Sequence, residues 1–208
     1  MKFLRAALLC LALTGAAPAP SISIVRGARP LVLHDGVTMI PNFAGDGREG
    51  MIVLGWRDNG NAHGFDQFTV MLPRGKDEDW NIVGLEREDP RAAFENFIRD
   101  DPHTGEDNVT SVRFVRATYQ GRSSVLLVTA DRHWQDSIPE PAATTIEIYA
   151  LKHNDGADVG ATVDYYTRIA SETAGRRYCN SDMALHVELG LPLPVEYGGS
   201  TSADGCSD

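Results

Sequence analysis

SVRFVRATYQGRSSVLLVT, residues 111–129, is the stretch that organises the predicted fold. Two runs rich in β-branched and aromatic residues flank Gln120-Gly121, a pair suited to a tight turn, so the stretch predicts a β-hairpin. Val125 to Val128 are apolar without alternation. This pattern predicts a strand covered on both faces and therefore central in its sheet.

Strand-like segments continue on both sides of this hairpin. Upstream, MIVLGW from Met51, FTVML from Phe68 and WNIVGL from Trp80 are separated by loops that contain glycine, which predicts a three-strand meander. Downstream, TTIEIYALK from Thr144 predicts one more strand. Residues 51–54 also lack alternation, so we expect that strand to be covered on both faces.

Helical spacing is expected after each group of strands. Apolar residues recur at helical intervals between Asp89 and Ile98, and a second helix is expected over residues 160–173. The predicted order of strands and helices is therefore β-β-β-α, and it occurs twice. The predicted fold class is α+β, an antiparallel sheet of about six strands with helices on one face. A last helix is expected from Asn180 or Ser181 to about Leu189.

The amino terminus has the parts of a secretory signal peptide. Lys2 and Arg5 precede an apolar run from Ala6 to Leu13, and small residues follow up to Ala19. The apolar run is about half of the roughly 20 residues that cross a bilayer, so we expect no stable membrane anchor.

We therefore expect residues 1–19 to be a signal peptide and residues 20–208 to form a single exported domain. Cleavage after Ala16, Ala17 or Ala19 is compatible with the small residues there. A short signal and an arginine-rich chain are typical of a bacterial protein, so the expected location is the periplasm or the medium.

Two cysteines remain after removal of the signal peptide, Cys179 and Cys206. An oxidising compartment favours a disulfide between them, and their spacing lacks the C-x-x-C form of redox and metal sites. The bond would tie down a carboxyl-terminal tail rich in Gly, Ser and Pro. In the chain-entropy model a loop of this length contributes roughly 3.5 kcal/mol.

The formal net charge is −10, and loss of Lys2 and Arg5 with the signal peptide lowers it by two, to −12. A nucleic-acid backbone or an anionic lipid surface would repel such a chain. The charge therefore predicts no nucleic-acid partner and favours a protein partner with a basic or neutral surface.

The acidic loop DDPHTGED, residues 100–107, is a candidate cation site. Carboxylates of Asp100, Asp101 and Asp107 could bind Ca²⁺, which prefers several oxygen ligands. The alternating ligand positions of a calcium loop are missing, however, so the loop is also interpreted as a solvated connector without any cofactor.

The loop ADRHWQDSIPEP, from Ala130, holds the other candidates. His133 beside Asp131 and Asp136 could act as a general base. Arg132 and Trp134 are residue types that anchor protein interfaces. The alternative interpretation is that the tryptophan and histidine cap the core at the end of a strand.

Three functions stay open. The first is an exported binding or accessory protein, of the inhibitor or immunity kind, acting through a protein partner. The second is a hydrolase that uses His133 with Asp131 or Asp136, with or without a cation. No G-x-S-x-G, H-E-x-x-H or P-loop motif occurs, which weighs against an enzyme. The third is a small-ligand or sugar binder, which needs Trp56, Trp80 or Trp134 to line an open cleft.

Overall fold

The structure is a computed structural model that describes residues 20–61, 63–74, 79–87, 94–103, 107–156 and 159–207. The predicted signal peptide, residues 1–19, lies outside the described residues. So do residues 88–93, where the helix predicted after Asp89 would begin.

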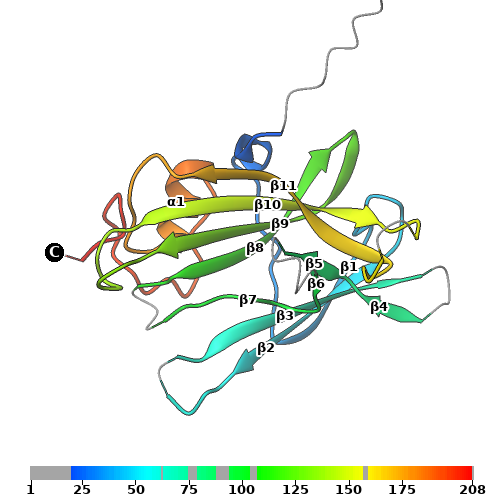
Figure 1. The fold of residues 1–208 in the computed structure, drawn as a ribbon, viewed down its shortest axis with the longest axis horizontal. Coiled ribbons are helices and arrows are strands. Elements are labelled where there is room, and N and C mark those ends of the chain that lie inside the picture. The colour runs from blue at the N-terminus through cyan, green and yellow to red at the C-terminus, as the bar shows by residue number, and fades with distance from the viewer. Residues whose placement is uncertain are drawn as a thin grey trace, which may run out of the picture.

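Two β-sheets, one above the other, dominate the described part of the chain (Figure 1). The six-stranded sheet has the order β6 (Phe94–Glu95), β5 (Gly84–Glu86), β11 (Asp164–Thr173), β10 (Ala143–His153), β9 (Arg122–His133) and β8 (Thr110–Tyr119). The five-stranded sheet has β1 (Gly36–Ile40), β2 (Gly50–Arg57), β3 (Phe65–Pro73) and β4 (Trp80–Ile82), with β7 (Ile98–Arg99) also paired to β3. The paired strands run antiparallel except β5 and β11, which are parallel.

The main core lies between the two sheets. Ile52, Val70 and Leu72 of the smaller sheet pack against a cluster that includes Phe114 and Leu127 of the larger sheet. These residues alternate with more exposed ones along β2 and β3, as expected for strands with one buried face. The two sheets are therefore joined by apolar burial on their facing sides.

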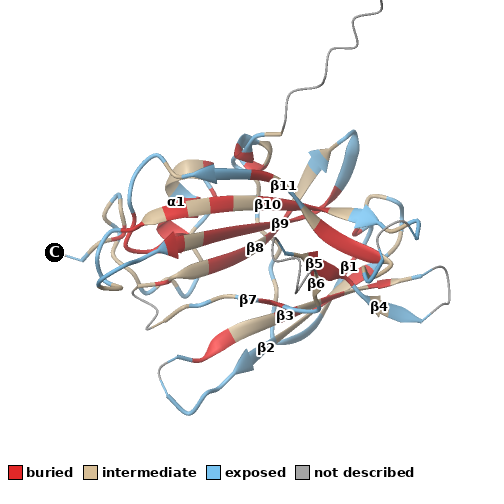
Figure 2. Ribbon diagram, viewed as in Figure 1, coloured by how far each residue is buried: buried red, intermediate tan, exposed pale blue. Residues whose placement is uncertain are grey.

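A second core covers the other face of the larger sheet. Leu126 and Val128 of β9 pack there with residues of the 3₁₀-helix η1 (Ile22–Val25) and the helix α1 (Ser181–Leu189). Figure 2 shows buried residues concentrated along β8, β9 and β10. These strands lie between the smaller sheet on one side and η1 with α1 on the other. The prediction that Val125 to Val128 are covered on both faces is confirmed, since these residues are fully buried.

The predicted carboxyl-terminal helix is confirmed as α1. Asn180 is its N-cap and accepts a hydrogen bond from the backbone N–H of Asp182. Gly190 ends the helix in the left-handed conformation, with φ of 68°. Asp182, in the first turn, forms an ion pair with Arg113 of β8, so the helix is also tied to the sheet by charge.

The predicted disulfide is confirmed as well. Cys179 and Cys206 are bonded, and their Cα atoms lie 4.9 Å apart. The backbone N–H of Cys179 also donates to the carbonyl of Asp204 at 2.9 Å. The tail is thus attached next to the start of α1.

The predicted α+β class, with its β-β-β-α repeat and helices on one face, is wrong, because the described residues form mostly strands. Phe94 and Ile98 lie in the short strands β6 and β7, and residues 164–173 form β11 where a helix was expected. The register of β10 against β11 shifts between Ile148 and Tyr149. This β-bulge interrupts the two-residue alternation of β11, which made its sequence resemble a helix.

Within the described ranges, no helix is long and apolar enough to cross a membrane.

Candidate functional site

The outer face of the smaller sheet carries a row of apolar side chains. Met39 of β1 lies opposite Met51 of β2, Met51 lies opposite Met71 of β3, and Met71 lies opposite Ile82 of β4. Directly opposed residues on neighbouring strands have Cβ atoms about 5 Å apart. The four side chains therefore form a continuous row across the sheet.

Neighbouring residues widen this row. Val37 lies opposite Val53 on one side of it, and Trp80 lies opposite Pro73 on the other. We call this surface the apolar face, and its residues are Val37, Met39, Met51, Val53, Met71, Trp80 and Ile82. Four of them are clearly exposed: Val37 by 50%, Met39 by 42%, Ile82 by 38% and Trp80 by 37%.

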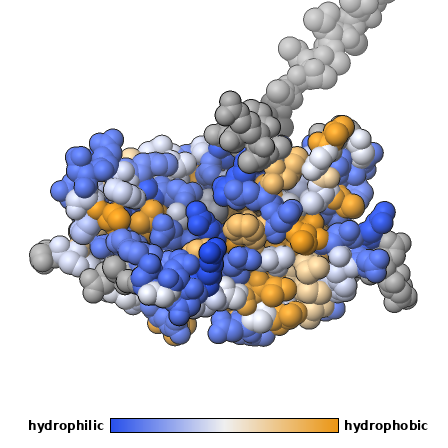
Figure 3. All heavy atoms as spheres, turned by 60° about the horizontal axis from the view of Figure 1, so that its bottom comes forward, coloured by the Kyte–Doolittle hydropathy of each residue, from blue (hydrophilic) through white to orange (hydrophobic). Residues whose placement is uncertain are grey.

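Alternation along the strands explains how the apolar face forms. Ile52 and Val70 point into the core, so Met51 and Met71 beside them point outward. The prediction that residues 51–54 are covered on both faces is wrong, since Met51 and Val53 are only partly buried. Figure 3, which turns the lower side of Figure 1 toward the viewer, shows hydrophobic residues gathered among hydrophilic ones.

A hollow adjoins the apolar face at Val53. Trp56, Arg57 and Gln67 also line it, and its volume is about 330 Å³. Trp56 is largely exposed there. The condition set for a small-ligand binder, a tryptophan at an open cleft, is thus met by Trp56.

Charged residues border the strands that carry the apolar face. Asp35, Glu49 and Asp79 are exposed and directly precede β1, β2 and β4. Arg57 and Arg74 are the exposed cations at the ends of β2 and β3. Arg57 also lies over the ring of Phe65, 5.4 Å from its centroid.

Asp131 and His133 come together on the inner face of β9, two residues apart. Asp131 accepts a hydrogen bond from the Thr110 hydroxyl at 2.7 Å, and burial, with the nearby Glu147, raises the pKa of its carboxyl. Nε2 of His133 lies 2.7 Å from the Thr145 hydroxyl. No described carboxylate makes an ion pair with His133, so the base lacks the orienting acid of a catalytic triad.

Asp136 and Trp134 lie apart from that face. Both line a small pocket with a volume of about 40 Å³, next to Arg177. Trp134 is 45% exposed, so it does not cap the core.

Arg132 is 3% exposed, and its guanidinium is engaged inside the protein. It donates hydrogen bonds to the carbonyls of Asp107, Asn108, Ile138, Glu140 and Tyr178. These contacts tie the loops around the end of β9 together.

The residues of the predicted cation loop have separate environments. Asp100 accepts a hydrogen bond from the backbone N–H of Asp66 at 2.8 Å, and burial raises the pKa of its carboxyl to about 7. Asp101 is exposed and accepts from the N–H of His103. Asp107 contributes its carbonyl to Arg132. Among the residues that the structure describes, no three His, Cys, Asp or Glu side chains are grouped as metal ligands.

GDGREG, residues 45–50, has the spacing of a dinucleotide-binding motif, and sequence reasoning overlooked it. Such a motif acts where a strand leads into a helix. Here it lies between the strands β1 and β2. Arg48 within it pairs with Asp164 of β11, so the loop joins the two sheets.

No protein-family model matches the chain, and no curated protein matches its sequence. One solved structure is similar in fold, a crystal structure of CarG, with a TM-score of 0.60. The two chains are 21% identical, and the match covers 76% of this chain and 93% of CarG. At this identity the likeness concerns the fold alone.

Proposed function

We propose that the mature chain is an exported binding protein that acts by docking a protein partner on the apolar face. The observation that carries this proposal is the unbroken row of Met39, Met51, Met71 and Ile82 across the smaller sheet. Large exposed apolar patches mark interaction sites in soluble proteins. Methionine suits such a surface because its flexible, polarisable side chain adapts to a partner.

The expected partner has an apolar patch surrounded by basic side chains. The chain carries a net charge of −10, and among the described residues that border the apolar face the carboxylates Asp35, Glu49 and Asp79 outnumber the cations Arg57 and Arg74. Complementary charge speeds encounter and selects partners, while apolar burial contributes most of the affinity. We therefore expect salt to slow association and the apolar substitutions to speed dissociation.

Binding is better supported than hydrolysis. His133 is hydrogen-bonded to Thr145 and Asp131 to Thr110, so each contacts a threonine and the two are not hydrogen-bonded to each other. A general base needs a partner that holds it toward the reacting group. The hydrolase alternative therefore has less support than either binding function.

The test is an affinity capture with tagged mature protein from envelope and culture fractions of the native host, at low and high salt. Met39→Asp and Val37→Asp place a charge on the apolar face. Val195→Asp is the matched control, because Val195 is fully exposed in the carboxyl-terminal tail. Circular dichroism melts establish that each variant folds.

We expect a stoichiometric partner that wild type and Val195→Asp retain and that both apolar-face variants lose, with affinity reduced roughly tenfold or more. A partner that all four proteins capture equally would contradict the proposal. So would a wild-type dimer in sedimentation that Met39→Asp converts to a monomer, because the apolar face would then bind a second copy.

A further inference from the structure

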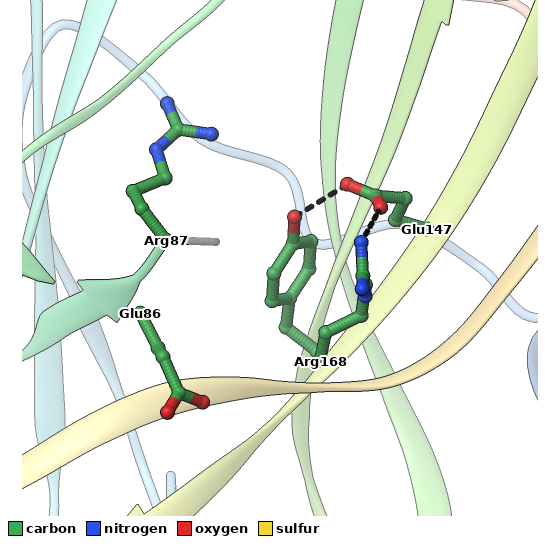
Figure 4. Close-up of a pocket in the computed structure, with 5 residues that line it drawn as sticks. Glu86, Arg87, Glu147 and Arg168 are labelled. Carbon is green, nitrogen blue, oxygen red and sulfur yellow. Dashed lines mark hydrogen bonds and ion pairs between the residues drawn. The ribbon is translucent and has the colours of Figure 1, made fainter. Parts of the chain in front are cut away.

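A second candidate site lies between β5, β10 and β11, away from the apolar face. Glu86, Arg87, Glu147, Tyr149 and Arg168 line a cavity with a volume of about 420 Å³ (Figure 4). Small-ligand pockets have volumes of roughly 300–1,000 Å³. The cavity is thus large enough for a small organic ligand, and all five lining side chains carry hydrogen-bonding groups.

Strand pairing assembles this cavity from distant segments. Glu147 and Tyr149 are alternate residues of β10 and share a face, and Arg168 of β11 lies opposite Tyr149. The parallel pairing of β5 with β11 adds Glu86 and Arg87 from an earlier part of the chain. The side chains are therefore held by paired strands, which favours a preformed site.

The acidic side of the cavity is held in place by hydrogen bonds. Glu147 accepts from the Tyr149 hydroxyl and from Arg168, both at 2.6 Å. Burial and the Glu147 charge raise the pKa of Tyr149, so its hydroxyl stays a donor at neutral pH. Glu86 accepts from the Thr167 hydroxyl. Thr167 lies opposite Ala150, which packs in the core on the other face of the sheet, so the Glu86 carboxylate is turned away from Glu147. The Glu147 carboxylate has a fixed position and keeps lone pairs for a cationic group.

Asp131 extends this acidic side along the same face of the sheet. It lies opposite Thr145, two residues from Glu147. Its described hydrogen bond is the one from Thr110, to Oδ1. Burial and Glu147 raise the pKa of Asp131 and Arg87 lowers it, so a ligand ammonium group would stabilise the Asp131 charge further.

Arg87 is the cationic group on the opposite side. Figure 4 shows its guanidinium across the pocket from the pair formed by Glu147 and Arg168, with Glu86 below. Arg87 donates to Glu95 from Nη2 at 2.7 Å. A guanidinium has five N–H donors, more than one carboxylate accepts, so Arg87 can also bind a ligand carboxylate.

We propose that this cavity binds a zwitterion, an amino acid or a short peptide. Arg87 binds the ligand carboxylate, and Glu147 with Asp131 binds its ammonium group. The site is independent of the proposed partner surface, and its ligand chemistry follows from Arg87 lying across the cavity from Glu147. Either proposal can therefore fail without the other.

The test is calorimetric titration of the mature protein with trialanine and, separately, with alanine. Trialanine amide lacks the carboxylate, and N-acetyl-trialanine lacks the ammonium group. The variants are Arg87→Gln and Asp131→Asn, with Arg122→Gln as the matched control because Arg122 is exposed at the start of β9, next to the turn from β8. A thermal melt of each variant shows that it folds.

We expect saturable binding of trialanine, weakened about tenfold by amidation and about tenfold by acetylation, since each removes a charged hydrogen bond. Arg87→Gln should weaken trialanine to the level of its amide and leave the amide unaffected. Asp131→Asn should weaken trialanine more than its acetylated form. Equal affinities of alanine and trialanine would identify an amino-acid site, and tighter trialanine a peptide site.

Two results would overturn the inference. One is the lack of saturation with alanine and trialanine up to about 10 mM, which leaves less than about 3 kcal/mol of binding free energy. The other is an affinity for trialanine that falls equally in Arg87→Gln and Arg122→Gln, or that is the same for trialanine and its amide. Met39→Asp should leave trialanine binding intact, which separates this site from the apolar face.

Discussion

At the residue scale, Arg132 shows how one buried cation can organise a set of loops. Its guanidinium donates to carbonyls from three segments of the chain, around Asn108, Glu140 and Tyr178. A buried charge is tolerated when hydrogen bonds replace its hydration. Burial gives it this internal role, although its residue type suggested an interface anchor.

Replacing Arg132 with Met should lower the free energy of unfolding by about 3–5 kcal/mol, because several buried carbonyls lose their donor. Urea denaturation measures the change. Arg132→Lys should recover only a small part, since one ammonium cannot reach all the acceptors. A loss below about 1 kcal/mol for Arg132→Met would show that water or local rearrangement satisfies the carbonyls.

The raised pKa of the Asp100 carboxyl predicts how the stability of the protein depends on pH. Its pKa is raised from its ordinary value to about 7, chiefly by burial. Between about pH 4 and pH 7 the folded protein therefore holds a proton that the unfolded chain has released. The free energy of unfolding should fall as pH rises through this range and should level off above it, since each pKa unit corresponds to about 1.4 kcal/mol.

Asp100→Asn should flatten this pH dependence and stabilise the protein at pH 8, because the amide oxygen still accepts from Asp66 and carries no charge. Asp131 has a pKa raised in the same direction, so part of the slope should remain. The measurement is urea denaturation at several pH values, with Asp101→Asn as the exposed control. Parallel profiles for wild type and Asp100→Asn would refute this account.

At the scale of elements, the disulfide and α1 act together on the carboxyl-terminal tail. Cys179 directly precedes the N-cap Asn180, and Cys206 belongs to the tail. Asp182 in the first turn accepts from Ser111 and Asn108 of the neighbouring segment. The bond thus attaches the tail to the end of the helix that is already fixed to the sheet.

Cys206→Ser should lower the free energy of unfolding by roughly 3 kcal/mol, through the loop-closure entropy regained by the unfolded chain. Thermal melts with and without reductant measure it. Reductant should lower the melting temperature of wild type toward that of Cys206→Ser and should leave the variant unchanged. A reductant effect on the variant itself would assign the loss to something other than this bond.

At the scale of the whole molecule, the predicted export of the chain would also change its charge. Removal of the predicted signal peptide would take Lys2 and Arg5 with it and make the remaining chain more acidic. The confirmed disulfide is compatible with an oxidising compartment. We propose a periplasmic or secreted location on these grounds.

Expression of the full chain in a bacterium should yield a periplasmic or secreted protein that begins near residue 17, 18 or 20 and contains the disulfide. Intact-mass spectrometry of the fractions, before and after reduction and alkylation, checks both points. Full-length protein that remains in the cytoplasm with alkylatable Cys179 and Cys206 would contradict the proposed location.

The sequence by itself determined the features that depend on local chemistry. Alternation and turn residues located β2, β3, β8, β9 and β10, capping residues located α1, and cysteine number predicted the disulfide. Strand alternation and helix capping are signals that arise within a few neighbouring residues. The disulfide could be predicted because each of the two cysteines has one available partner.

Only the tertiary structure decided which faces are covered and which segments meet. Met51 to Leu54 and Val125 to Val128 have the same apolar pattern, yet only the second run is buried on both faces. Arg87 meets Glu147 at the cavity because β5 pairs with β11. Both outcomes depend on pairing between distant segments, which a local pattern does not encode, and both candidate sites result from it.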